Sequence, residues 1–274
     1  MSNLDKKTVE SFGDEWSKFD QSKMSEKEGK IIFEKYFSIF PLDNLSENSI
    51  GFDMGCGTGR WAYFVAPKVA HLHCIDPSNA LDIAKIKLKK FKNINFHKST
   101  VDSVDLKEQS QDFGYSLGVL HHVPNTQAAI NSCSKLLKSG APLLLYLYYS
   151  FDNRPWWFFL FWKLTDILRR IICHLPPKIK ILVTDLIAIT VYYPIARTCK
   201  FFEKLKINTN KIPLSFYRDK SFYTMRTDSR DRFGTVLEQR FSRVKIKEMM
   251  ENARLHNIKF SEKEPYWCVV GFKR

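Results

Sequence analysis

The chain has 274 residues, of which 44% are hydrophobic and 14% aromatic. This is enough apolar surface for a buried core in one large domain, or in one domain with an insertion. Its six cysteines are scattered without a C-x-x-C pair, which argues against a disulfide framework or a zinc site and favours a reducing cytoplasm. The formal net charge is +14, and the first residues lack the apolar core of a signal peptide.

The first half of the chain predicts alternating strands and helices. Residues 1–45 form a polar, mostly helical pattern, and Pro41 with the polar stretch 43–49 interrupts it. The strands expected after that are 50–54, 71–76, 94–98, 113–119 and 142–149, and the helices between them are 60–66, 80–91 and 126–137. Alternation at this spacing indicates βαβ units and a parallel sheet with helices on both faces.

The end of the chain predicts one more helix, 241–255, and two more strands, 258–261 and 267–273. Roughly 85–90 residues separate this helix from the fifth strand, far more than a connection needs, so they form an insertion. We therefore expect four segments, which are a helical N-terminal cover (1–45), a ligand-binding core (46–150), a helical and aromatic cap (151–240) and the end of the core (241–274).

The insertion is apolar enough to raise the question of a membrane span. Its aromatic run 156–162 is short, and the stretch 179–196 carries Lys180, Asp185 and Pro194. Because a span needs about 20 apolar residues and charges are costly at the bilayer centre, the sequence predicts no span. Two interpretations stay open, a helical cap that lies in a membrane interface and a buried lid over the active site.

The basic excess lies in the second half of the chain. Residues 1–150 hold 18 Lys and Arg against 17 Asp and Glu, whereas residues 151–274 hold 25 against 12. Such a field favours phosphorylated small molecules, nucleic acid or an acidic membrane face. A general lysine bias that only aids solubility is the alternative.

A glycine-rich turn follows the first predicted strand. The sequence Ile50-Gly-Phe-Asp-Met-Gly-Cys-Gly-Thr-Gly-Arg-Trp61 ends a short apolar run with Asp53 and then places glycines at every second position. Glycines at this spacing let a strand turn sharply into a helix while a ligand lies against bare backbone. A second acid, Asp76, ends the second strand 23 residues later, where a carboxylate can accept both hydroxyls of an adenosine ribose.

With the segment 112–124 after the fourth strand, these motifs resemble the class I S-adenosylmethionine (SAM) methyltransferases. The resemblance implies an α/β, Rossmann-like, seven-stranded and mostly parallel sheet with helices on both faces, a helical cap inserted after the fifth strand, and SAM as cofactor. It implies that Asp76 holds the ribose, that Asp102 approaches the adenine amino group, and that the segment after the fourth strand lines the methionine part. The residues expected around SAM are Trp16, Asp53, Gly55, Cys56, Gly57, Gly59, Arg60, Asp76, Pro77, Val101, Asp102, Leu117 and Gly118.

Three of these predictions have a stated alternative. Trp16 is expected to stack near the sulfonium of SAM, or else to anchor the first helix. His122 and His121 are candidate general bases for an acceptor hydroxyl, because histidine titrates near neutral pH. A histidine pair at this position also often only shapes the pocket of such enzymes.

A second polar cluster precedes the last helix. Arginines make bidentate contacts to phosphate or carboxylate, and aromatic residues are interleaved with them here. The cluster is therefore predicted to bind the substrate through Tyr217, Tyr223, Arg226, Arg232 and Arg240. The acids between these arginines would equally allow internal pairing that stabilises the cap.

The sequence thus predicts a SAM-dependent methyltransferase that acts on a small-molecule acceptor with an anionic group. The best specific hypothesis is O- or N-methylation of a sugar, a sugar nucleotide or a lipid-linked intermediate, in the cytoplasm and with peripheral membrane contact left open. One alternative is an RNA methyltransferase that uses the basic second half. Another is an enzyme that transfers a different part of SAM. No metal is expected.

Overall fold

The computed structural model describes residues 3–18 and 25–274, with the backbone alone over 14–18. Residues 3–18, 29–150 and 237–274 form one compact unit, here called the core unit. Residues 25–28 and 151–236 form a second one, here called the helical unit.

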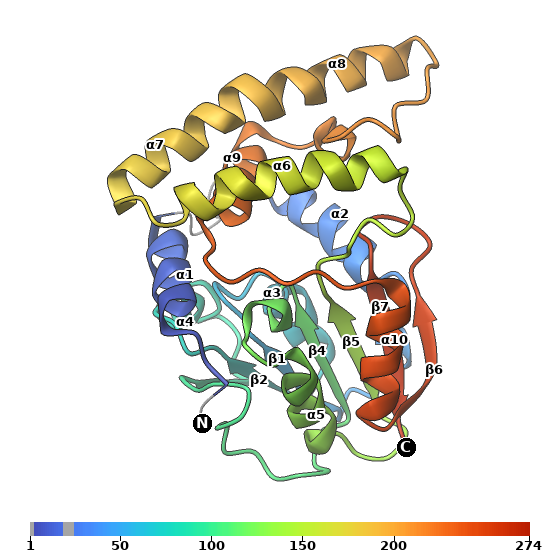
Figure 1. Ribbon diagram of the computed structural model, residues 1–274. Coiled ribbons are helices and arrows are strands. Elements are labelled where there is room, and N and C mark those ends of the chain that lie inside the picture. The colour runs from blue at the N-terminus through green and yellow to red at the C-terminus, as the bar shows by residue number, and fades with distance from the viewer. Residues whose placement is uncertain (1–2, 19–24) are drawn as a thin grey trace. The chain divides into compact units, whose positions relative to one another are not determined.

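The core unit contains the seven-stranded, mostly parallel sheet that the sequence predicts (Figure 1). The spatial order is β3-β2-β1-β4-β5-β7-β6, in which β7 is antiparallel to both of its neighbours. The strands are β1 (Ile50–Met54), β2 (His71–Ile75), β3 (Ile94–His97), β4 (Phe113–Leu117), β5 (Pro142–Tyr146), β6 (Leu255–Phe260) and β7 (Cys268–Lys273). Because β1, β2, β4 and β5 are mutually parallel neighbours, their carboxyl ends meet at one edge of the sheet.

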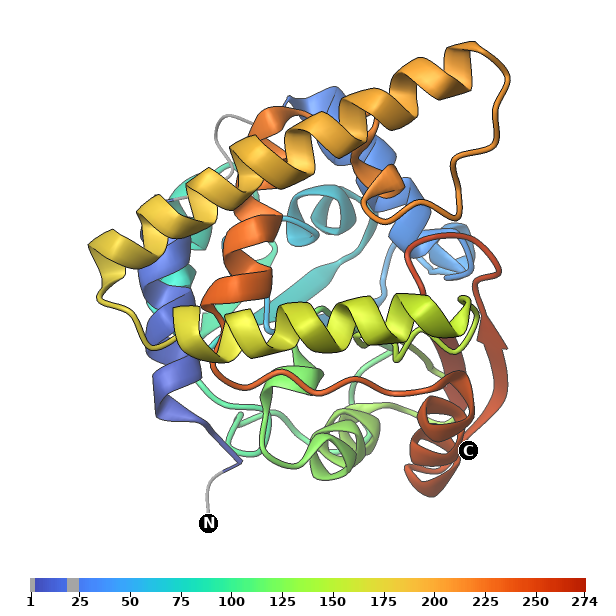
Figure 2. The same cartoon turned by 45° about the horizontal axis from the view of Figure 1, so that its top comes forward.

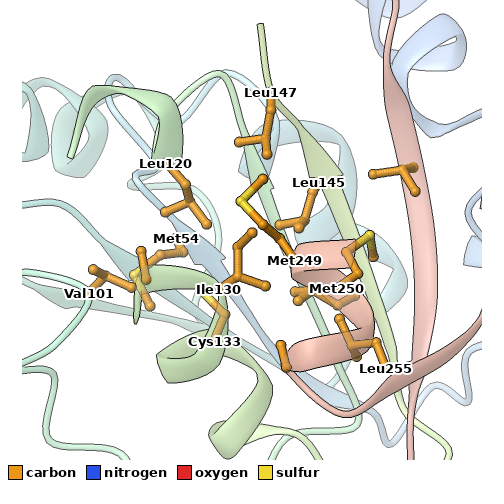
Figure 3. Close-up of a cluster of buried hydrophobic side chains, with 14 of the residues drawn as sticks. Met54, Val101, Leu120, Ile130, Cys133, Leu145, Leu147, Met249, Met250 and Leu255 are labelled. Atoms are coloured by element: carbon orange, nitrogen blue, oxygen red, sulfur yellow. The ribbon is translucent and has the colours of Figure 1, made fainter. Parts of the chain in front are cut away.

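Helices cover both faces of this sheet. The core-unit helices are α1 (Lys6–Lys18), α3 (Ala62–Val65), α4 (Ala80–Lys87), α5 (Thr126–Leu136) and α10 (Arg243–Asn252), and α2 (Glu26–Phe37) enters it from residue 29. On one face, α5 and α10 pack against β1 and β5 around Ile130, Leu145 and Met250 (Figure 3). On the other face, Phe37 of α2 contacts Tyr115 of β4, with ring centroids 5.3 Å apart.

The boundaries differ from the sequence prediction at the last helix. The expected helix 241–255 is shorter, since α10 ends at Asn252 and β6 begins at Leu255. The residue between the helix end and the strand, Arg254, has a φ of 61°, a left-handed conformation that cannot continue a helix.

The helical unit is built from α6 (Trp156–Ile172), α7 (Pro177–Ile187), α8 (Tyr193–Lys204) and α9 (Phe222–Gly234). A π-helical turn, Ala188–Tyr192, joins α7 to α8, so Pro177–Lys204 is one continuous helix of 28 residues. In Figure 2, α9 crosses between α6 and this long helix, and it packs against both of them. Its small apolar core contains Ile172, Tyr192, Ala196, Met225 and Phe233.

Among the described residues, Pro177–Lys204 is the one helix that is long and apolar enough to cross a membrane, by length and composition alone. The helix continues through the Lys180, Asp185 and Pro194 on which the sequence prediction against a span rested. Pro194 lies in the first turn of α8, directly after the π-helical turn. Proline is tolerated at that position, because a first-turn residue needs no hydrogen-bonded N–H.

Candidate active site

The glycine turn after β1 has the geometry of a ligand cradle. Gly55, Gly57 and Gly59 all have positive φ, at 79°, 51° and 75°. A side chain on Gly55 would collide with Val119, and one on Gly59 would lie 2.5 Å from a methyl carbon of Leu88. At Gly57, by contrast, an added Cβ would meet nothing within 4 Å. Gly55 and Gly59 therefore serve packing, whereas Gly57 presents bare backbone to open space.

Asp76 lies directly after β2 and is held against this turn. Its Oδ2 accepts a hydrogen bond from the Gly57 N–H at 2.8 Å, and its Oδ1 accepts from the backbone N–H and the hydroxyl of Ser78 at 2.8 and 2.6 Å. Burial raises the pKa of the Asp76 carboxyl, and these hydrogen bonds oppose the rise. Because each carboxylate oxygen has two lone pairs, Asp76 can still accept from a diol.

Asp53, in β1, is a buried carboxylate that lacks a hydrogen-bond donor. Both of its oxygens are buried, and neither has a partner among the residues that the structure describes. Burial raises the pKa of Asp53 well above its usual value, the neighbouring Tyr115 hydroxyl moderates the rise, and the charge of Asp76 adds to it. An unpaired buried acid is costly, so this position fits a ligand group that brings a positive charge or an N–H donor.

The remaining residues predicted for the cofactor differ in their surroundings. Gly118, just after β4, has a φ of 82° and lies near Tyr146, while Leu117 ends the strand beside it. Asp102 is exposed and accepts from the Asn3 N–H at 3.0 Å and from the Thr100 hydroxyl at 2.6 Å. The others are the buried Cys56 and Val101, the half-buried Pro77, and Arg60, whose guanidinium lies 4.5 Å from the Trp61 ring centre.

The side chain of Trp16 lies outside the described residues, so its predicted stacking stays a prediction. Its helix α1 does reach the same edge of the sheet. The ring of Phe12 meets the ring of His122 edge-on, with centroids 5.0 Å apart.

The two candidate bases lie in a short 3-10 turn, Leu120–His122, after β4. His121 is fully buried and stacks on Tyr148, with ring centroids 3.8 Å apart, and neither ring nitrogen has a hydrogen-bond partner among the described residues. Burial lowers the pKa of His121 well below its usual value, and nearby His122 and Arg240 lower it further. His121 is therefore neutral at pH 7.

His122 has a defined tautomer. Its Nδ1 lies 2.6 Å from the carbonyl oxygen of Leu237, an acceptor, so Nδ1 carries the proton. In the neutral ring the lone pair is then on Nε2. This is the arrangement by which a backbone carbonyl orients a catalytic imidazole.

Sequence reasoning missed an aromatic wall at the same edge. Tyr36 of α2 meets Tyr146 at the end of β5, with ring centroids 5.0 Å apart, and Tyr146 lies 5.9 Å from Tyr148. Arg240 covers Tyr148 at 5.0 Å and donates to Glu238 at 2.8 Å. The run Tyr146-Leu-Tyr-Tyr149 at the carboxyl end of a predicted strand was the available signal, since ligands bind beyond such ends.

The predicted substrate cluster is divided between the two units. Arg240 lies in the core unit, and the other four residues lie in the helical unit. There, Arg226 makes two hydrogen bonds to Asp185 at 2.9 and 2.6 Å, and Arg232 lies 3.7 Å from Asp166. Tyr217 packs on Tyr192. These contacts match the internal pairing that was the alternative interpretation, and substrate binding by this cluster stays a prediction.

Comparison with known proteins places the core in one family. The family model described as "Methyltransferase domain" matches residues 52–145. The ubiquinone biosynthesis O-methyltransferase of Nitrosomonas europaea is 32% identical over 116 residues, covering 41% of this chain and 47% of that protein. Phosphoethanolamine N-methyltransferase 2 of Caenorhabditis elegans is 32% identical over 100 residues, covering 35% and 23%. The matched region thus spans less than half the length of these curated relatives.

Solved structures share the fold beyond this region. A SAM-dependent methyltransferase from Thermotoga maritima aligns with a TM-score of 0.52 and 13% identity, covering 96% of this chain and all of that one. The YcgJ protein from Bacillus subtilis aligns with a TM-score of 0.51 and 14% identity, covering 84% and 70%. From its core sequence and its sheet order, the chain belongs to the class I SAM-dependent methyltransferase superfamily, whose cofactor is S-adenosyl-L-methionine.

Proposed function

We propose that this protein transfers a methyl group from SAM to an oxygen or nitrogen atom of a small-molecule acceptor. The observation that carries the proposal is the open space over Gly57, which lies beside the buried Asp76 carboxylate at the carboxyl edge of the sheet. Similarity to relatives named as O- and N-methyltransferases supports the same chemistry.

The residues at this edge fit SAM. Asp76 offers oxygen lone pairs to the ribose hydroxyls, and the bare backbone at Gly57 allows close approach. Asp53, which lacks a donor among the described residues, matches the cationic ammonium of the methionine part. When bound, SAM supplies an electrophilic methyl group on a sulfonium, and the enzyme contributes mainly proximity and in-line orientation.

We assign the proton of an acceptor hydroxyl to His122. The hydrogen bond from Nδ1 to Leu237 leaves the lone pair on Nε2, which can take a proton as the acceptor oxygen attacks the methyl group. His121, kept neutral by burial, supplies a second polar ring against which the acceptor can be oriented.

For the acceptor, we propose a ring-bearing molecule of the sugar, sugar-nucleotide or lipid-linked class. The faces of Tyr36, Tyr146 and Tyr148 provide flat apolar surfaces of the kind on which rings stack. Arg240 brings a positive charge to the same wall, although it is shared with Glu238. An anionic group on the acceptor would compete with that carboxylate.

The activity is tested with SAM labelled on the methyl group. Hydroxyl, amine and sugar-nucleotide acceptors are supplied, each free and attached to a lipid chain. We expect label in the product and S-adenosylhomocysteine as by-product. Release of methylthioadenosine, or of methionine without transfer of the label, would show that a different part of SAM is transferred.

The base is tested with His122→Gln and the matched control His256→Gln. His256 lies in β6, and its Nδ1 also hydrogen-bonds a backbone carbonyl, that of Phe272, at 2.8 Å. We expect His122→Gln to lower kcat on the order of 10²- to 10⁴-fold with SAM affinity unchanged, and His256→Gln to leave kcat unaltered. Equal kcat values for the two variants would refute the assignment.

A further inference from the structure

The helical unit presents a large apolar surface to solvent. Among the described residues, 21 large hydrophobic side chains are exposed, and 18 of them lie between Trp156 and Ile207. They are Trp156, Trp157, Phe159, Leu160, Phe161, Leu164, Ile167, Leu168, Ile171, Ile179, Leu182, Leu186, Ile189, Val191, Tyr193, Phe201, Leu205 and Ile207. Apolar clusters of this extent mark an interaction surface rather than scattered exposure.

The burial pattern of these helices is the reverse of that in a soluble protein. An ordinary surface helix turns its apolar stripe to the core and its charges to water. In α6, however, the buried face carries Asp166 and Arg169, joined by a 2.6 Å ion pair, while Leu164 and Leu168 face outward. Along Pro177–Lys204 the buried positions are the small or polar Thr184, Ala188, Tyr192, Ala196 and Cys199.

The charges of this unit indicate what covers the surface. Residues 151–236 hold sixteen Lys and Arg against seven Asp and Glu, a formal net charge of +9. Most of these arginines are internal, but five lysines are exposed and form no ion pair within the described part of the chain: Lys163, Lys178, Lys204, Lys206 and Lys211. Tryptophans and lysines beside exposed leucine and isoleucine side chains are typical of a helix that lies in a lipid–water interface.

We propose that the outward faces of α6 and of Pro177–Lys204 dock the protein onto an anionic lipid bilayer. The apolar side chains enter the boundary between headgroups and acyl chains, and the exposed lysines contact anionic headgroups. This docking goes beyond the proposed methyl transfer, because neither SAM nor an acceptor takes part in it.

The long helix lies along the bilayer rather than across it. At 1.5 Å per residue its 28 residues are about 42 Å long, more than the roughly 30 Å of a hydrocarbon core. One face of it is held by α9, where Asp185 binds Arg226 with two hydrogen bonds and the Ser229 hydroxyl donates to the Thr184 carbonyl at 2.9 Å. Spanning would separate the helix from α9 and strand these charges in hydrocarbon.

The test is sedimentation of the whole chain with vesicles. One set contains phosphatidylcholine alone and the other adds phosphatidylglycerol. We expect sedimentation with the anionic vesicles, weakened by added salt, together with a blue shift of tryptophan fluorescence. Failure of the folded protein to bind either set would overturn the proposal, whatever the methyltransferase assay shows.

Two variants form a matched pair for this test. Leu182→Ser changes a side chain of α7 that is 70% exposed, and Val244→Ser changes one of α10, in the core unit, that is 77% exposed. Since both are exposed, neither should unfold the protein, which circular dichroism checks. We expect Leu182→Ser to weaken vesicle binding on the order of tenfold and Val244→Ser to leave it unchanged. Equal binding by the two variants refutes the assignment of this surface.

Two other occupants are separated by further measurements. Protein that resists alkaline carbonate extraction from the vesicles would show a spanning helix and overturn interfacial docking. A dimer in lipid-free solution that Leu182→Ser dissociates, without vesicle binding by wild type, would show that a second copy covers the surface. Extraction by carbonate and a monomer in solution are the results that support the proposal.

Discussion

Replacing Gly57 with alanine separates cofactor binding from folding. Gly57 has a φ of 51°, and an added Cβ would meet no protein atom within 4 Å. The substitution therefore adds a methyl group only to the space that we assign to SAM. The matched control is Gly140→Ala, because Gly140 has a φ of 80°, is equally open, and precedes β5 at the opposite edge of the sheet.

The expected magnitudes follow from the geometry. An alanine in the left-handed region costs about 1–2 kcal/mol, so both variants should lose that much stability. For a chain of this size, each kcal/mol corresponds to roughly 2–4 °C in Tm. At Gly57 the new methyl group also crowds the bound cofactor, and overpacking by one methyl costs about 1–3 kcal/mol. SAM affinity should therefore fall roughly 5- to 150-fold for Gly57→Ala and stay unchanged for Gly140→Ala.

Isothermal calorimetry measures the SAM dissociation constant, and thermal unfolding without ligand measures stability. Two results would refute the reasoning. One is SAM binding by Gly57→Ala as tight as that of wild type, which would mean that the open space is not the cofactor cradle. The other is an equal loss of affinity in both variants, which would trace the effect to general destabilisation.

Three further predictions concern stability. Gly59→Ala combines a φ of 75° with a Cβ 2.5 Å from Leu88, so chemical denaturation should show a loss of about 2–5 kcal/mol; a loss below 1 kcal/mol would contradict the packing role. Asp185→Asn removes the charged partner of the half-buried Arg226, and a loss of about 1–2 kcal/mol is expected in the same assay, with no change meaning that solvent screens the pair. Burial lowers the pKa of His73 to about 4, below the 6.5 of the unfolded chain, so the folded state loses stability as pH falls from 6.5 to 4. Urea midpoints at pH 7 and pH 5 should therefore differ less in His73→Gln than in wild type, and an equal difference would show that His73 does not titrate in this way.

Local chemistry determined the scaffold. Apolar runs ending in glycine or acid predict strands that turn into helices, and the alternation of Phe52 and Met54 with neighbouring residues is set by the two-residue period of a strand. The positive φ of Gly55 and Gly59 follows from the same local constraint, because the turn leaves no room for side chains there. The order of strands and the cofactor cradle were therefore predictable from the sequence.

The surroundings of each site residue depended on tertiary structure. Tyr36 joins Tyr146 across 110 positions of the sequence, and Leu237 orients His122 across 115. Nothing local in the sequence indicates that His121 loses both of its hydrogen-bond partners, or that Arg226 faces Asp185.

The same limit applies to the aromatic run 156–162 and to the apolar stretch after it. Helical periodicity showed that these residues form helices, yet apolar residues on nearly every face left the buried side undefined. Packing against α9 chose the face that carries Asp166, Arg169 and Thr184, and so turned the leucines and tryptophans outward. A periodic pattern defines an element from neighbours along the chain, whereas burial depends on which distant element supplies the matching surface.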